Sequence, residues 1–147
     1  MSDNNTQATP EQVLYAVIQE KLMLAGLLLM FITFALYLLG IMDSVVPLDK
    51  ISTYWRLPVH DYLAAINAEY LHAAHTPTGW AWLKFVGKGD FLNFLPIAIL
   101  AGTTIVCYLA IVPGLFRRGD KAYGFMALVE AVILTLAASG LLAVGGH

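Results

Sequence analysis

This chain of 147 residues is poor in charge and in cysteine. Only 12% of its residues are Asp, Glu, Lys or Arg, and its formal net charge is -2. The few basic residues form no stripe that could follow a phosphate backbone, so no nucleic acid is expected as a partner. The single cysteine, Cys107, provides neither an intrachain disulfide nor a thiolate metal site by itself.

Several common chemistries also lack their signatures. None of the four histidines falls inside a long apolar run, so the chain alone cannot offer two axial histidines to a haem within a membrane. There is no P-loop, no dinucleotide glycine fingerprint and no Ser-His-Asp arrangement. No internal repeat of the transporter type is visible. The sequence therefore predicts no catalysis by this chain on its own, and it leaves any cofactor unknown.

Apolar sequence is what the chain has in abundance. Its residues are 59% hydrophobic, with a mean hydropathy of +0.73. They are concentrated in three runs long enough to cross a bilayer, at residues 22–42, 91–116 and 122–144. The expected fold is all-α: an integral membrane protein with three transmembrane helices and an extracytoplasmic interfacial helical segment between the first and the second.

Boundary signals divide the chain into four parts. Thr9, Pro10 and Gln12 fit an N-cap, a proline in the first helical position and a capping-box partner, so a helix is predicted to begin near Pro10. The short stretch between the last two apolar runs predicts a tight antiparallel hairpin. The four parts are a disordered cytoplasmic tail (1–9), an amphipathic helix continuing into the first transmembrane helix (10–43), the extracytoplasmic interfacial segment (44–90) and the transmembrane hairpin (91–147).

The orientation is predicted from the positive charges. Arg117, Arg118 and Lys121 crowd into the short hairpin connection, which is therefore expected on the cytoplasmic side. Three spans then place the N-terminus in the cytoplasm and the C-terminus outside. The sequence therefore predicts a multi-pass protein of a bacterial inner membrane.

The segment at 44–90 is rich in aromatic residues. It contains all three tryptophans, and apolar residues recur every three or four positions from about Pro58 to His75, which predicts an amphipathic helix on the outer membrane surface. A further short helical turn is expected after Gly79. Indole rings are typical of the headgroup level of a bilayer. The predicted interfacial anchors are Trp55, Trp80, Trp82 and Lys84.

Glu130 is an ionisable residue inside the third apolar run. Counting equally from Gly119 at the centre of the hairpin places it level with Tyr108, beside Cys107, so we expect these three to form a buried polar group with a tyrosine-to-carboxyl hydrogen bond. One interpretation is a proton or cation relay. The other, which we favour, is a buried carboxyl that locks the hairpin or docks onto another subunit.

Glu69, His72 and His75 are spaced by three residues on the predicted surface helix. Glu-x-x-His occurs as a metal-ligand pair, and His60 and His147 are predicted on the same side of the membrane. However, one surface helix offers too few ligands, so the favoured interpretation is a solvated helix face with no metal.

Small residues recur at helical spacing along the last two spans, which indicates close helix packing and says nothing about catalysis. They are Ala127, Ala131, Thr135 and Ser139 on the third span, with Ala98 and Gly102 on the second.

By elimination, the favoured function is a small accessory or structural subunit of a larger membrane complex, in respiratory electron transfer or transport. Its expected partners are the lipid bilayer and other membrane subunits, or further copies of itself. Two alternatives stay open: an oligomeric proton or ion conductor using Glu130, and an outward-facing metal or quinone site near His72 and His75.

Overall fold

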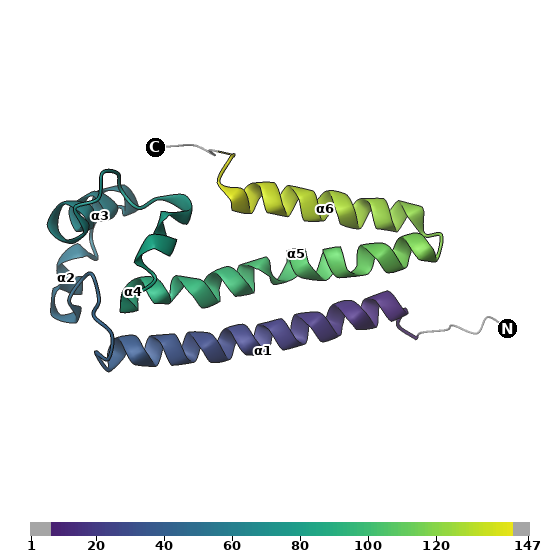
Figure 1. Cartoon of the computed structure of the whole chain (residues 1–147), viewed down its shortest axis with the longest axis horizontal. Coiled ribbons are helices and arrows are strands. Elements are labelled where there is room, and N and C mark those ends of the chain that lie inside the picture. The colour runs from purple at the N-terminus through teal and green to yellow at the C-terminus, as the bar shows by residue number, and fades with distance from the viewer. Residues whose placement is uncertain (1–6, 143–147) are drawn as a thin grey trace. The chain divides into compact units, whose positions relative to one another are not determined.

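The computed structural model describes residues 7–142, and this part of the chain is all-helical, without strands (Figure 1). Three of its helices are long and apolar enough to cross a membrane, and a short helix lies between the first and the second, which confirms the predicted fold class. The elements are α1 (Pro10–Leu38), η1 (Leu48–Lys50), α2 (Ile51–Tyr54), α3 (Val59–Ile66), η2 (Asn67–Leu71), η3 (Gly79–Phe85), α4 (Gly89–Leu92), α5 (Phe94–Arg117) and α6 (Lys121–Ser139).

Two compact units are present, and the helices α1 and α5 contribute residues to both. The hairpin unit contains residues 7–25 and 99–142, and the connector unit contains residues 26–98. The predicted tail up to residue 6 and the last five residues, His147 included, lie outside the described residues.

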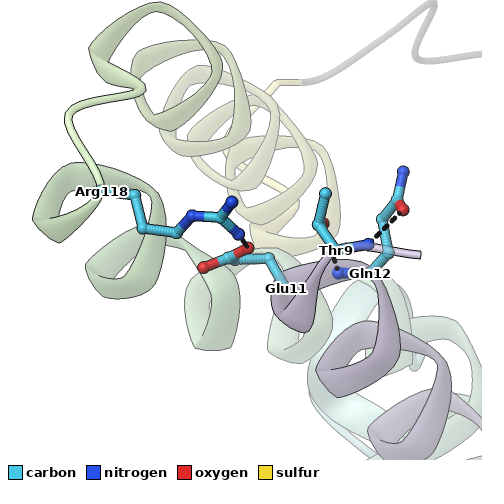
Figure 2. A network of polar contacts seen from close by, with 4 residues as sticks. All are labelled: Thr9, Glu11, Gln12 and Arg118. Atoms are coloured by element: carbon cyan, nitrogen blue, oxygen red, sulfur yellow. Dashed lines mark hydrogen bonds and ion pairs between the residues drawn. The ribbon is translucent and has the colours of Figure 1, made fainter. Parts of the chain in front are cut away.

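Helix α1 begins at Pro10, as the capping signals predict, and ends at Leu38. The Gln12 amide donates to the Thr9 hydroxyl oxygen at 3.3 Å, and the Gln12 side chain accepts from the Thr9 amide at 2.9 Å, which confirms the capping box (Figure 2). Beyond Leu38 the chain turns at Gly40, whose φ of +65° is readily adopted by glycine. The Gly40 amide bonds to the Tyr37 carbonyl and the Ile41 amide to the Leu36 carbonyl, so the helix ends in a Schellman motif.

In the hairpin unit, α5 and α6 are joined by only three residues, which confirms the predicted hairpin. Gly119 has a φ of +86°, and its amide and that of Asp120 satisfy the last carbonyls of α5 in a second Schellman motif. A Cβ atom at Gly124 would lie 3.2 Å from the Phe116 ring, so the first turn of α6 needs glycine for this close approach. Ala127 and Ala131 continue the buried stripe of α6, as small residues do in membrane helix packing.

The connector unit has an apolar core of its own. Val45, Val46, Ile66 and Phe91 are buried together, and partly buried aromatic and aliphatic side chains surround them. The short helical turn predicted after Gly79 is present as η3. The segment between the first two long helices is therefore folded.

The predicted helix from Pro58 to His75 is wrong in its last four residues. Helix α3 ends at Ile66, continues as one turn of π-helix and stops at His72, whose φ is +48°. The Asn67 side chain bonds to both the amide and the carbonyl of Ala73, at 3.1 Å each. Asparagine competes with helical hydrogen bonding in this way, and periodicity alone does not reveal it.

Asp90 fastens the two ends of the connector. Its carboxylate accepts from the amides of Val45 and Val46 at 3.0–3.1 Å, and the Gly89 amide donates to the Asp43 carbonyl at 2.9 Å. We call this set of contacts the Asp90 clasp. The Asp90 carboxylate thus joins segments 44 and 45 residues apart in the chain.

A candidate polar cleft in the hairpin unit

Glu11 pairs with Arg118 inside the hairpin unit. Figure 2 shows the Glu11 carboxylate and the Arg118 guanidinium pointing toward one another from α1 and from the turn after α5. Glu11 is buried, while the Arg118 side chain is about half exposed. A Cβ atom at Gly114 would lie 3.2 Å from the Glu11 carboxylate, so glycine at this position lets Glu11 pack closely on α5. The pair ties the first turn of α1 to the end of α5.

One turn further along α1, Tyr15 packs against α5. The Cys107 thiol donates to the Tyr15 carbonyl oxygen at 3.7 Å, and Cys107 is fully buried. The rings of Tyr15 and Tyr108 meet edge to face, with their centroids 5.7 Å apart and their planes at 70°. This geometry is the favourable one for an aromatic pair.

Tyr108 and Glu130 interact across the hairpin. The Tyr108 hydroxyl and the Glu130 carboxyl lie close enough to interact, and both side chains border the same cleft. Glu130 is the tenth residue of the nineteen in α6, about 13.5 Å from Lys121 along the axis. Cys107 is buried and Tyr108 half-buried, but the Glu130 side chain is exposed in the chain taken alone. Burial of Glu130 thus stays a prediction that needs cover from outside the described residues.

Glu11, Tyr15, Tyr108 and Glu130 line one cleft, which we call the hairpin cleft. Its volume is about 610 Å³, within the range of small-molecule sites. Three carboxyl side chains and three tyrosines contribute to it, together with aliphatic side chains. The lining residues are Thr9, Glu11, Gln12, Tyr15, Tyr108, Ile111, Leu115, Asp120, Tyr123, Met126, Ala127 and Glu130.

Sequence reasoning found only part of this cleft. Tyr108 and Glu130 of the predicted polar group line the cleft, whereas its third member, Cys107, does not. The sequence did not indicate Glu11 and Tyr15. The available signal was their spacing of four residues, which puts both on one face of α1. An amphipathic helix at this position would expose Glu11 and bury the apolar Val13 and Leu14, whereas Glu11 is buried and Val13 and Leu14 are exposed.

The predicted cytoplasmic charges lie at the turn of the hairpin. Arg118 is held by Glu11, whereas Arg117 ends α5 and Lys121 begins α6, both exposed. Their side of the membrane stays a prediction.

The four predicted anchors are in the connector unit and differ in exposure. Trp55, Trp80 and Lys84 are exposed. Trp82 instead is partly buried against the connector core, stacked on Trp80 and in contact with Phe94 at 5.9 Å between centroids. The placement of Trp82 is explained by packing, and the anchoring role of the others stays a prediction.

Glu69, His72 and His75 do not share a helix face, because the helix stops before His72. Glu69 accepts a hydrogen bond from the Tyr54 hydroxyl. This bond raises the pKa of Tyr54, since the neighbouring carboxylate disfavours a tyrosinate. His60 is exposed. Within residues 7–142 no group of three or more His, Cys, Asp or Glu side chains is placed to hold a metal ion.

A second cleft, of about 620 Å³, lies in the connector unit between α3 and the start of α5. Tyr62, Trp82, Phe91 and Phe94 form its aromatic walls, and Asp90 of the clasp reaches it. Burial raises the pKa of Tyr62, and the Asp90 carboxylate adds to the rise. The polar group of this cleft is already engaged by backbone amides, so the cleft is mainly apolar.

These features define a class: three long apolar helices and a folded connector indicate a multi-pass helical membrane protein. The chain belongs to the same family as an uncharacterized protein of Archaeoglobus fulgidus. The two are 41% identical over 143 residues, which cover 97% of this chain and 96% of the archaeal protein. No family model and no solved structure matches the chain.

Proposed function

We propose that this protein is a small subunit of a membrane assembly, which it serves by helix packing and anchoring rather than by catalysis of its own. The observation that carries the proposal is the exposure of Glu130 near the middle of α6. A charged carboxyl facing lipid at that depth costs about 3 kcal/mol, so ionisable groups inside a membrane are covered by protein or water. A partner that packs over this face of α6 removes that cost.

The apolar residues around Glu130 do not by themselves support assembly, because apolar side chains are the normal surface of a helix in lipid. The position of Glu130 indicates which side of α6 should contact a partner. Ile133 lies on the same side of α6 as Glu130, three residues further on, whereas Val132 lies about 160° away around the helix. Both are exposed, so they form a matched pair of probe positions.

Photo-crosslinking from these two positions tests the proposal. A photoreactive residue at Ile133, in membranes of cells that make the full-length chain, is expected to give one discrete protein adduct, either with another subunit or with a second copy. The same residue at Val132 is expected to give lipid adducts. In a Glu130→Leu background the Ile133 adduct should decrease, because the polar contact is lost. Lipid adducts alone at both positions would contradict the proposal.

The kind of assembly remains part of the proposal. A respiratory or transport complex gives an adduct with a different protein, and a homo-oligomer gives an adduct of twice the mass of the chain. In either case we propose that the hairpin turn, with its three basic residues, faces the cytoplasm. A cysteine placed at Asp120 should then resist a membrane-impermeant thiol reagent in intact cells and react after lysis.

A second candidate is an oligomeric conductor of protons or ions. It is supported by the hairpin cleft, which includes both Glu130 and Thr9 just ahead of α1, so polar groups follow one another from the helix end inward. If Glu130 carries the proton, Glu130→Gln should abolish proton flux into liposomes while the protein still assembles. Flux that is unchanged by the substitution would remove this candidate.

A further inference from the structure

We propose that the hairpin cleft binds a lipophilic organic cation, with the positive charge beside Glu130 and the apolar body against the tyrosines and aliphatic side chains. This inference goes beyond the proposed assembly and needs no second chain, because all the lining residues belong to the hairpin unit of one chain. Charge, aromatic lining and size each support it.

The charge of the cleft has one sign. Glu11, Asp120 and Glu130 line it, and no lysine, arginine or histidine does. Glu11 is neutralised by Arg118, but within residues 7–142 neither Asp120 nor Glu130 has an ion-pair partner. A carboxylate in a medium of low dielectric constant attracts a cation far more strongly than it would in water. The cleft therefore selects against anions.

The aromatic lining favours a particular kind of cation. Tyr15, Tyr108 and Tyr123 all border the cleft. The face of an aromatic ring is electronegative and attracts cations, and the attraction is strongest for ions that give up their hydration easily. Quaternary ammonium and phosphonium ions are of this type.

The size of the cleft excludes a bare metal ion as its natural occupant. Hard cations take six or more oxygen ligands close by, whereas no metal-binding group of side chains is found within residues 7–142. A volume of about 610 Å³ suits a molecule of many atoms. Ile111, Leu115 and Met126 supply an apolar surface for its body.

Tetraphenylphosphonium and tetraphenylborate make a sharp pair of probes, since they share size and shape and differ in the sign of charge. Equilibrium dialysis with the purified full-length chain in detergent should show saturable binding of the cation and not of the anion. Glu130→Gln should weaken cation binding roughly tenfold or more, because a charge-assisted contact is lost. Equal uptake of both ions, or unchanged cation binding in Glu130→Gln, would overturn the proposal.

Glu20→Gln is the matched control for this experiment. Glu20 is an exposed carboxyl of α1, and it lies about 140° around the helix from Tyr15 and outside the cleft. Its removal changes the net charge of the chain equally and should leave cation binding unchanged. A loss equal to that of Glu130→Gln would mean that the cation follows net charge and not the cleft.

Two further measurements cover the case in which Glu130→Gln fails to fold. Tyr108→Phe keeps the ring and should bind the cation within about threefold of the wild type, whereas Tyr108→Leu should bind at least about fivefold more weakly. In the unmodified chain, dicyclohexylcarbodiimide should react with Glu130, and the phosphonium ion but not the borate should slow that reaction. Equal rates with both ions would contradict a site at Glu130. An added phosphatidylethanolamine that displaces the phosphonium ion would make a lipid amine, and not a free cation, the occupant.

Discussion

The hairpin unit and the connector unit are held together by different kinds of side chain. In the hairpin unit the buried apolar residues within the described part of the chain are small, namely Gly124, Ala127, Ala131 and Cys107. In the connector unit they are large, with Ile66 and Phe91 at the centre of a ring of aromatic groups. In lipid, helices gain little free energy by burying apolar side chains against one another. They pack closely instead at positions where both backbones carry small residues. A core of large residues is stabilising where the alternative is water. The contrast supports a connector that folds against an aqueous phase.

Polar groups follow the same division. In the connector unit the Asp90 carboxylate is fully occupied by the amides of the clasp. In the hairpin unit Glu130 lies beside Tyr108 and is exposed in the chain taken alone. Polar groups in the connector complete its own fold, whereas those in the hairpin remain available to something outside it.

Each unit has an intrinsic probe, so the comparison can be tested. All three tryptophans, Trp55, Trp80 and Trp82, lie in the connector unit, and their fluorescence reports its unfolding. The only cysteine, Cys107, lies buried in the hairpin unit, and its reactivity toward a small thiol reagent reports the opening of that unit.

The largest expected effect is that of Ile66→Ala. Ile66 is 2% exposed at the centre of the connector core, and such truncations cost about 2–5 kcal/mol. The midpoint of the tryptophan transition in denaturant should fall strongly, while the labelling rate of Cys107 in the native state stays close to that of the wild type. Val59→Ala, on the same helix at a site 75% exposed, should change neither. Equal changes in both probes for Ile66→Ala would show that the two units unfold as one.

Asp90→Ala should come second. It leaves the amides of Val45 and Val46, both buried residues, without their acceptor, at about 1–3 kcal/mol for a buried donor. Water offsets part of this at a half-buried carboxylate, so we expect about 2 kcal/mol, read from the tryptophan transition. Asp49→Ala, at an exposed carboxyl of the connector, is the control. A stability equal to that of the wild type would remove the clasp from the account of the connector.

Ala131→Leu tests the small-residue packing of the hairpin unit. Ala131 is 1% exposed, and overpacking a buried site costs about 1–3 kcal/mol. We expect a loss near 1 kcal/mol, because helices in a detergent micelle can move apart, together with faster labelling of Cys107 and an unchanged tryptophan transition. Val132→Leu, at the exposed neighbouring position, should label at the wild-type rate. Slow labelling in both variants would mean that α6 packs elsewhere.

Local signals and regular helix geometry explain which parts of the fold could be predicted from the sequence. The three apolar runs, the capping box at Thr9 and the hairpin turn at Gly119 are local signals, and each is found in the structure. Counting along two antiparallel helices of fixed rise predicted that Glu130 lies opposite Tyr108, and both residues line the hairpin cleft. Wherever a regular helix extends from a known turn, its partner residues could be counted.

Contacts between segments far apart in the chain could not be predicted from the sequence. Glu11 and Arg118 are 107 positions apart, and the Asp90 clasp joins segments 44 and 45 residues apart. The prediction that the helix continues to His75 failed for a local reason, since the Asn67 side chain replaces helical hydrogen bonds. The polar face of α1 was misjudged because Glu11 is satisfied by a distant arginine, which periodicity cannot indicate.

The smallest expected effect is an alkaline one, confined to the connector unit. The hydrogen bond to Glu69 raises the pKa of Tyr54 above its ordinary value of 10, and burial raises that of Tyr62. A raised pKa favours the protonated hydroxyl in the folded state, so this contribution is complete below about pH 10 and is lost as the pH rises further. The tryptophan transition should thus be insensitive to these groups near neutral pH and should move to lower denaturant above about pH 10.

Tyr54→Phe and Glu69→Gln separate this contribution from general alkaline damage. The first removes the titrating hydroxyl, and the second removes the charge that opposes its ionisation while keeping an acceptor. Both should therefore show a shallower alkaline decline than the wild type in the tryptophan transition, with Cys107 labelling of the native hairpin unit followed in parallel at a fixed lower pH. Declines as steep as that of the wild type in both variants would place the alkaline sensitivity outside the Tyr54–Glu69 contact. A shallow decline in these two variants, with unchanged Cys107 labelling, would show that the connector alone carries a proton-dependent part of its stability.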